Sequence, residues 1–404
     1  MNAPETPSNL GALAGLKVLD LSRILAGPWS TQLLGDLGAD VVKIERPKSG
    51  DDTRTWGPPW LSDDHGLNTS ESAYYLCANR NKRSLAVDIS EPQGQHLVRE
   101  LACRADIFVE NFKVGGLAEY GLDYASLSTL NPRLIYCSIT GFGQTGPYAS
   151  RPGYDFLIQG MGGLMSLTGQ PDGEPGGGPL KVGVALTDIL TGLYATVGIL
   201  AAVNHRERTG CGQHLDLALM DVQVATLANQ ASNFLIGKKV PVRLGNAHPN
   251  IVPYQDFPTA DGHMIVAVGN DTQFSNLCEA LGHADWAADE RFQTNPVRVA
   301  NRALLVDRIQ RVTRSRSTAD WVALLDEAGV PCGAINTLDK VFDDEQVQAR
   351  GLRIEIDHPT AGKVPLIANP IRLSASPVQY RHAPPLLNAD AQAILSNWLN
   401  TSSS

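Results

Sequence analysis

The sequence predicts an α/β protein whose large domain holds a parallel, doubly wound sheet, with a second, smaller α+β domain. Through the first 140 residues short apolar runs alternate with helical patterns, which is typical of parallel strands covered by helices. Near residue 237 this alternation changes character. The 404 residues also exceed the roughly 250–300 at which one core stops growing. We therefore expect a large domain from 1–227 and 331–404, with a small domain at 228–330.

The first predicted elements form a compact βαβ unit. Residues 17–21 read as a buried strand, and Pro28 in a short turn starts a helix over 29–37. Gly38 ends that helix, and a second strand follows at 41–44.

The alternation continues along the chain. We expect a helix opened by Ser90 and Pro92, a strand at 106–110, a helix at 125–130 and a strand at 134–140. Later elements are expected at 214–219, 221–235, 262–269, 274–281, 297–313, 319–328, 332–335, 352–356 and 364–373. A ligand of a doubly wound sheet lies beyond the carboxyl ends of the strands, here residues 22–28, 45–54, 110–116 and 141–155.

Charge excludes two classes of partner. The 33 basic and 42 acidic side chains leave a net charge of −9, so we expect neither nucleic acid nor a membrane surface as a partner. The most apolar run, 189–203, is shorter than a bilayer span and contains Gly192 and Gly198. These features predict a soluble, cytoplasmic protein. No histidine pair has zinc spacing, so no metal is expected.

A glycine motif at 141–146, GFGQTG, follows a predicted strand and suggests a dinucleotide site. Such a site needs a helix to begin there, because the pyrophosphate binds helix N–H groups. Pro147, Pro152 and Gly153 follow at once and prevent a helix. The motif therefore predicts a turn-rich loop and argues against a nicotinamide dehydrogenase.

Cations gather at two places in this acidic chain. Lys43 and Arg46 lie at the end of a buried strand and suggest a phosphate site, where Arg46 could donate two parallel hydrogen bonds. Residues 79–84, NRNKRS, hold three more cations. Alone they read as a solvated loop, and together with Arg46 they could supply positive charge to an anionic ligand.

Two aspartates are candidates for chemistry. Asp155 and Asp188 each lie where a predicted loop enters a helix. An aspartate there is most often an N-cap, yet the helix dipole also favours the ionised form that a nucleophile needs. The pattern alone leaves both interpretations open.

Several ordered motifs, taken together, resemble the class III CoA-transferases, the family of formyl-CoA transferase and carnitine CoA-transferase. They are LAGP at 25–28, LGADVVKIERP at 37–47, NRNKRS at 79–84, VENF at 109–112, GFGQTGP at 141–147, GYD at 153–155 and TD at 187–188. The likeness covers residues 16–387. Two further segments, GDDTRTWGPP at 50–59 and IVPYQ at 251–255, resemble the family's members that act on succinyl-CoA and glutarate.

This resemblance implies a Rossmann-like large domain built from both ends of the chain, within an interlocked homodimer. It implies that Asp188 is the nucleophile, which would form an aspartyl anhydride and then an aspartyl-CoA thioester. With an ordinary pKa of about 3.9, Asp188 would be fully ionised at neutral pH. The substrates would be an acyl-CoA, such as succinyl-CoA, and a short carboxylic acid, either a dicarboxylate such as glutarate or a sulfinate analogue. No tightly bound cofactor is expected.

The resemblance also implies a set of residues in contact with CoA: Leu25, Ala26, Arg46, Val87, Asp88, Ile89, Asn111, Phe112, Tyr154 and Asp155. Glu119 and Pro152 replace two basic residues that formyl-CoA transferase uses, and Lys113 or Arg151 could substitute for them. Asn246 and His248 would shape the acceptor pocket.

The α-methylacyl-CoA racemases share this fold and provide the alternative. They move a proton with a histidine, and Tyr154 stands at that position here, which favours a transferase. A non-catalytic CoA-binding protein is a further alternative, but it would not need Asp188.

Overall fold

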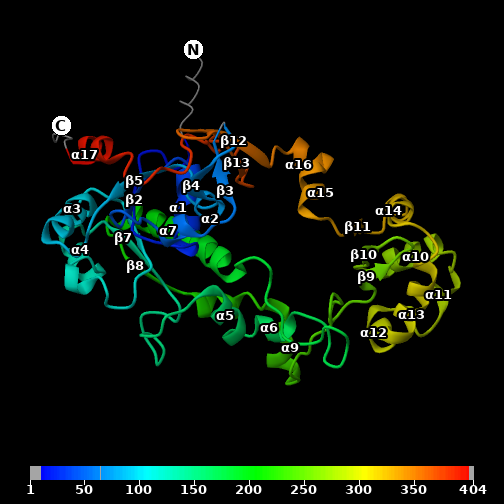
Figure 1. The fold of residues 1–404 in the computed structure, drawn as a ribbon. Coiled ribbons are helices and arrows are strands. Elements are labelled where there is room, and N and C mark those ends of the chain that lie inside the picture. The colour runs from blue at the N-terminus through cyan, green and yellow to red at the C-terminus, as the bar shows by residue number, and fades with distance from the viewer. Residues whose placement is uncertain (1–10, 64, 400–404) are drawn as a thin grey trace, which may run out of the picture. The chain divides into compact units, whose positions relative to one another are not determined.

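The computed structural model describes residues 11–63 and 65–399 (Figure 1). The chain divides into two compact units. The first contains the chain up to Leu164, the segment Val182–Leu235 and the chain from Gln346 onward; the second contains Met165–Lys181 and Ile236–Glu345.

A six-stranded sheet forms the centre of the first unit. Its strand order is β5-β2-β1-β6-β7-β8, and all its neighbours are parallel. The strands are β1 (Lys17–Asp20), β2 (Asp40–Glu45), β5 (Lys82–Ala86), β6 (Ile107–Glu110), β7 (Ile135–Thr140) and β8 (His214–Ala218). The predicted parallel α/β architecture is confirmed.

The strand order reverses between β1 and β6. From β1 the chain adds β2 and β5 on one side, and it then adds β6, β7 and β8 on the other. Ligands of open α/β sheets bind at such a switch point, beyond the carboxyl ends of the strands. The loops after β1 and β6 are therefore where the fold itself creates a crevice.

Successive strand residues point to opposite faces, and a core covers each face. Leu19, Val42 and Phe108 belong to the core that contacts α3 (Pro92–Ala102), α4 (Tyr124–Leu130) and α17 (Ala391–Leu399). Their neighbours along the strands belong to the core that contacts α1 (Ala26–Asp36) and α7 (Leu186–Thr209). Both faces of the central strands are covered, so consecutive apolar residues occur in β1, β2, β6 and β7, whereas the edge strands β5 and β8 contain charged residues such as Lys82 and Asp216.

Smaller elements complete the first unit. They are the pair β3 (Trp60–Ser62) and β4 (Asn68–Ser72), the pair β12 (Arg353–His358) and β13 (Gly362–Ile367), and the helices α2 (Ala73–Leu76), α5 (Asp155–Met161), α8 (Leu219–Ala225) and α16 (Glu345–Ala349). Helices α6 (Leu164–Leu167) and α9 (Ala228–Gly237) lie where the chain passes between the units.

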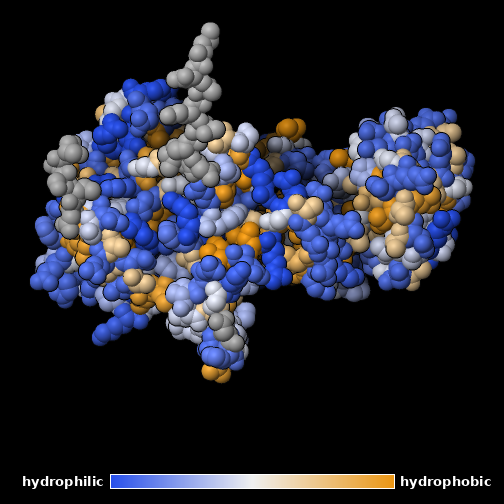
Figure 2. Space-filling view, turned by 90° about the horizontal axis from the view of Figure 1, so that it is seen from above, coloured by the Kyte–Doolittle hydropathy of each residue, from blue (hydrophilic) through white to orange (hydrophobic). Residues whose placement is uncertain are grey.

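Helix α7 contains the apolar run 189–203 and extends beyond it at both ends. Its 24 residues are long and apolar enough to cross a membrane by length and composition alone. It packs, however, against α1 and β7. A Cβ at Gly192 would lie 2.7 Å from the Ala26 carbonyl oxygen, so this glycine permits close packing of the two helices. The surface visible in Figure 2 is predominantly hydrophilic, with apolar residues in scattered groups.

The second unit has its own antiparallel sheet, β11-β10-β9, formed by Cys332–Ala334, His263–Ala267 and Tyr254–Pro258. Its helices are α10 (Asp271–Ala280), α11 (Asp285–Ala288), α12 (Asn295–Ala300), α13 (Arg302–Thr313), α14 (Thr318–Glu327) and α15 (Leu338–Asp343). The sequence analysis ended the small domain at 330, whereas β11 pairs with β10 and extends this unit past that point.

Candidate active site

The loop after β1 is held in place before any ligand arrives. The backbone N–H of Arg23 donates to Asn111 Oδ1 at 2.9 Å, and the Arg23 carbonyl accepts from Asn111 Nδ2 at 2.7 Å. Ile24 has φ 72°, and its N–H donates to the carboxylate of Asp51 at 3.2 and 3.3 Å. Because Asn111 directly follows β6, the loops on the two sides of the switch point are joined.

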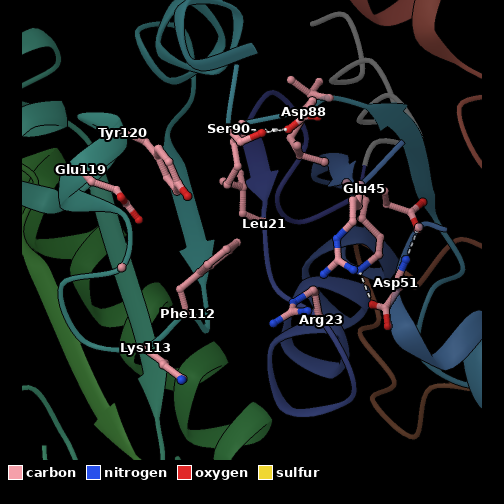
Figure 3. A pocket seen from close by; sticks show the side chains of 17 residues that line it. Leu21, Arg23, Glu45, Asp51, Asp88, Ser90, Phe112, Lys113, Glu119 and Tyr120 are labelled. Atoms are coloured by element: carbon pink, nitrogen blue, oxygen red, sulfur yellow. Dashed lines mark hydrogen bonds and ion pairs between the residues drawn. The ribbon is translucent and has the colours of Figure 1, made fainter. Parts of the chain in front are cut away.

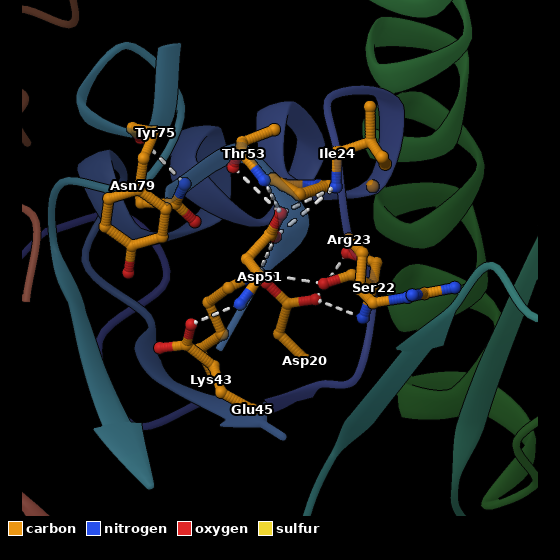
Figure 4. Close-up of polar contacts among 12 residues, drawn as sticks. Asp20, Ser22, Arg23, Ile24, Lys43, Glu45, Asp51, Thr53, Tyr75 and Asn79 are labelled. Carbon is orange, nitrogen blue, oxygen red and sulfur yellow. Dashed lines mark hydrogen bonds and ion pairs between the residues drawn. The ribbon is translucent and has the colours of Figure 1, made fainter. Parts of the chain in front are cut away.

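A buried ion cluster supports this loop from below (Figure 4). Lys43 Nζ lies 2.9 Å from Asp51 Oδ2, with both side chains fully buried, and it donates to the Ser22 carbonyl at 2.8 Å. Burial opposes ionisation of Asp51, but Lys43 and the Thr53 N–H outweigh it and lower its pKa to about 2. The predicted role of Lys43 at a phosphate is wrong, because its charge is satisfied inside the protein.

The basic segment 79–84 is likewise internal. Arg80 forms two hydrogen bonds to Asp36 at 2.9 and 2.6 Å, and Lys82 Nζ lies 3.1 Å from Asp20 Oδ2. Arg83 pairs with Asp40 at 2.7 Å. Both predictions for this segment were wrong. It enters the sheet as β5, and each cation meets an aspartate of β1, α1 or β2.

A cavity of about 580 Å³, the larger cavity, lies beyond the ends of β1, β2, β5 and β6 (Figure 3). Six of the residues predicted to contact CoA line it: Arg46, Val87, Asp88, Ile89, Phe112 and Lys113. Glu119 lines it as well. Residues of four separate strand ends are thus brought to one place.

A second cavity of about 210 Å³, the Asp188 cavity, lies beside it. It is lined by Leu25, Ala26, Asn111, Phe112, Lys113, Arg151, Tyr154 and Asp188, all singled out from the sequence. Tyr154 is 64% exposed, whereas Asp188 is 9% exposed. The cavity is therefore open to solvent at Tyr154, whereas the carboxylate of Asp188 is buried.

Asp188 lies in the first turn of α7 but does not cap that helix. Among the residues of 11–63 and 65–399, no donor or cation pairs with its carboxylate, and its backbone N–H donates to Asp155 Oδ1. Burial, and then the charge of Asp155, raise the pKa of Asp188 to about 7. The expectation of full ionisation at neutral pH was therefore wrong, because the carboxylate is desolvated beside a like charge.

Asp155 supplies the cap that α7 lacks. Its Oδ1 accepts from the N–H of Thr187 at 2.9 Å and of Asp188 at 3.3 Å, and its Oδ2 accepts from Gln159 Nε2 at 2.7 Å. The Asp155 side chain is turned to α7, where it fixes the backbone that carries Asp188. Its contact with CoA stays a prediction. Of the two roles left open for the aspartates, Asp155 takes the capping one.

Comparison with known proteins shows the family to which this chain belongs. The family model for CoA-transferase family III matches residues 13–391. The chain belongs to CoA-transferase family III. It is 50% identical to a succinate-glutarate CoA-transferase of Agrobacterium fabrum over 97% of this chain and 96% of that one. It is 44% identical to the human succinyl-CoA:glutarate CoA-transferase, over 96% of this chain and 86% of that one.

Solved structures agree with this assignment. The crystal structure of a CaiB/BaiF family protein from Brucella suis has a TM-score of 0.83 at 52% identity, covering 96% of this chain and all of that one. The transferase is thus an enzyme that uses CoA thioesters as substrates, as the sequence motifs predicted.

The glycine motif of this transferase forms the loop that the prolines predicted. No helix begins between residues 141 and 153, and α5 starts at Asp155. A Cβ on Gly141 would lie 2.5 Å from the Cα of Gly153, so the two ends of the loop touch through glycine backbone. The predicted loop, on which the argument against a dehydrogenase rests, is confirmed.

The predicted acceptor residues belong to the second unit. Asn246 Nδ2 donates to Asp256 Oδ1 at 3.1 Å, beside a separate cavity of about 340 Å³. The carbonyl of His248 accepts from Arg302 at 2.7 Å. Their part in acceptor binding stays a prediction.

Three polar residues in or near the site were not singled out from the sequence. Arg23 lines both the larger cavity and the Asp188 cavity. Burial raises the pKa of Glu110 to about 7, and its carboxylate accepts from the Phe112 N–H at 2.8 Å. Burial and the charge of Asp188 raise the pKa of Tyr74 to about 12. A charged residue at a strand end was the available signal for Arg23 and Glu110.

Proposed function

We propose that this transferase moves CoA from succinyl-CoA to a short dicarboxylic acid such as glutarate, with Asp188 as the nucleophile. The observation that carries the proposal is the unpaired, buried carboxylate of Asp188 in a cavity that shares residues with the larger one. The printed names of the relatives at 44–50% identity support succinyl-CoA and glutarate as the substrates. A sulfinate-bearing acid of the same size is an alternative acceptor.

The two cavities accommodate the two ends of the donor. The adenosine part of CoA would occupy the larger cavity, which Arg46 lines and where its guanidinium would bind a phosphate through parallel hydrogen bonds. The pantetheine chain would then run past Phe112 and Leu25 and bring the thioester to Asp188. No tightly bound cofactor is required.

The reaction exchanges one thioester for another. The carboxylate of Asp188 attacks the thioester carbonyl and the C–S bond breaks. CoA leaves as a thiolate, and the succinyl group remains on Asp188 as a mixed anhydride. The thiolate then attacks the aspartyl carbonyl, which releases succinate and forms an aspartyl-CoA thioester. The acceptor carboxylate attacks this thioester and expels the thiolate again. Attack of the thiolate on the acceptor's carbonyl yields the new acyl-CoA and regenerates Asp188.

No general base is needed, because the nucleophile is a carboxylate and a thiolate leaves readily. The raised pKa of Asp188 marks a desolvated anion, which attacks more readily than a hydrated one. An anhydride reacts with water, so exclusion of water from Asp188 also protects the intermediate.

We also propose that the enzyme is cytoplasmic and forms the interlocked homodimer of its family. One face of α7 supports the dimer: Leu193, Tyr194 and Val197 are 41%, 46% and 65% exposed in the single chain. Apolar side chains in such a row favour a protein partner over water.

Tyr154 favours a transferase over a racemase. It borders the Asp188 cavity at the start of α5, and a phenol does not exchange protons near neutral pH as a histidine does.

The test combines succinyl-CoA with a panel of carboxylic and sulfinic acids and measures the new thioesters by mass spectrometry. Without an acceptor, we expect a CoA adduct on the tryptic peptide that contains Asp188, cleaved by hydroxylamine. The Asp188→Asn variant should show neither adduct nor turnover. Solvent deuterium appearing at the α-carbon of a branched acyl-CoA, without transfer to any acid, would contradict the proposal in favour of a racemase.

A further inference from the structure

The larger cavity and the Asp188 cavity meet at three residues. Arg23, Phe112 and Lys113 line both. Figure 3 shows Phe112 and Lys113 on one side of the larger cavity and Arg23 on the other. Two of the three junction residues are cations, although the chain carries a net charge of −9.

The guanidinium of Arg23 is held in place yet has an unused donor. Its NH1 lies 2.9 Å from Asp52 Oδ2, and its centre lies 5.6 Å from the centre of the Phe112 ring. Its Nε–H is buried and has no partner among the described residues. A buried donor without a partner is costly, so a site of this kind indicates a ligand that completes it.

A diphosphate matches this junction. If CoA spans the two cavities, as the proposed function requires, its diphosphate lies between the adenosine in the larger cavity and the pantetheine that leads to Asp188. That group is a dianion, and the junction supplies two cations. The Nε and a terminal nitrogen of an arginine can bind two oxygens of one phosphate in parallel.

We propose that Arg23, together with Lys113, binds the diphosphate of CoA. Asp52 orients the guanidinium through NH1, and the buried Nε–H is left without a partner among the described residues. The alternative ligand of Arg23 is the terminal carboxylate of the succinyl group, which would lie beside Asp188. Arg23 also lines the larger cavity, which Asp188 does not line, and this favours the diphosphate.

Three succinyl thioesters used as CoA donors distinguish binding of the diphosphate from binding of the succinyl carboxylate. Succinyl-CoA carries the diphosphate and the 3′-phosphate, succinyl-dephospho-CoA lacks only the 3′-phosphate, and succinyl-pantetheine lacks both. For Arg23→Gln we expect kcat/KM to fall about 10- to 100-fold with the first two donors. With succinyl-pantetheine we expect no change. Arg23→Lys should recover part of the loss.

Arg104→Gln is the matched control. Arg104 lies in the same unit, its side chain is 35% exposed against 34% for Arg23, and it also pairs with one carboxylate. Replacement of Arg104 should leave kcat/KM unchanged with all three donors. An equal loss for Arg23→Gln with succinyl-pantetheine would overturn the proposal in favour of the succinyl carboxylate or of a structural role.

Calorimetry supplies a measurement that does not need turnover. Arg23→Gln should weaken binding of CoA by the same factor and leave the affinity for 3′-adenosine monophosphate, which has no diphosphate, unchanged. Unchanged affinity for CoA would overturn the assignment. Failure of the wild-type enzyme to transfer CoA between any donor and acid would instead refute the proposed function and leave this binding result standing.

Discussion

Asp51 and Asp188 are both buried at the carboxyl edge of one sheet, yet their protonation differs. Asp51 has Lys43 at 2.9 Å and a pKa lowered to about 2. Asp188 has no cation beside it in the described part of the chain, has Asp155 nearby, and has a pKa raised to about 7. Burial is the largest influence on both and raises both, so the partner decides the outcome. A paired carboxylate holds the loop in place, and an unpaired one is available for chemistry.

The substitution with the largest expected effect on activity is the one that removes the unpaired carboxylate. Asp188→Asn should lower kcat at least about a thousandfold, because the amide cannot act as the nucleophile. Steady-state assays with succinyl-CoA and the best acceptor measure this. Asp221→Asn is the control, since Asp221 is also in the first turn of a helix but is exposed. Substantial turnover by Asp188→Asn would remove Asp188 from the mechanism.

Removing the paired carboxylate should instead damage the fold. Asp51→Asn leaves Lys43 buried without its counter-charge and should lower the free energy of unfolding by about 3–5 kcal/mol. Urea unfolding followed by circular dichroism checks this. The double variant Lys43→Met/Asp51→Leu should recover much of the stability. If Asp51→Asn were as stable as the wild type, the contrast with Asp188 would fail.

Asp188→Asn should also make the protein more stable. Because folding raises the pKa of Asp188 to about 7, ionising it costs folding free energy as pH rises from about 4 to 7, and the full cost is present above 7. At pH 8 the variant should gain at most about 4 kcal/mol, and at pH 4 nothing. Unfolding curves at the two pH values decide this. A gain that does not change with pH would show that the charge is not the cause.

The smallest expected effect is on the pH dependence of kcat/KM. Since the reactive form is the carboxylate, kcat/KM for succinyl-CoA should fall about tenfold per pH unit below a midpoint near 7. Asp155→Asn removes the neighbouring charge and should move that midpoint to lower pH. A midpoint unchanged by this substitution would mean that burial alone sets the pKa.

Sequence reasoning predicted five of the six strands of the central sheet, because apolar runs and helix stops are local signals, but it missed β5, which begins with charged residues. It also placed Asp188 and part of the lining of both cavities, largely through family motifs. It could not predict the partners of cations. Arg80 and Lys82 looked like solvent-facing charges, and only the fold shows that Asp36 and Asp20 lie opposite them.

The pKa of Asp188 was missed for the same reason. A helix start favours the anion, whereas desolvation and the charge of Asp155, 33 residues earlier in the chain, have the opposite effect. Such effects depend on distances between segments that are far apart in the sequence. They become visible only when the fold brings the segments together.

The two hydrogen bonds between the Asn111 amide and the backbone of Arg23 have a mechanical consequence. One side chain satisfies both the donor and the acceptor of a single residue, so separating the loops after β1 and β6 would break both bonds at once. A change in the distance between these two loops therefore costs two hydrogen bonds. For a donor bound as proposed, the distance from its phosphates to its reactive carbon must match the spacing at which these bonds hold the loops.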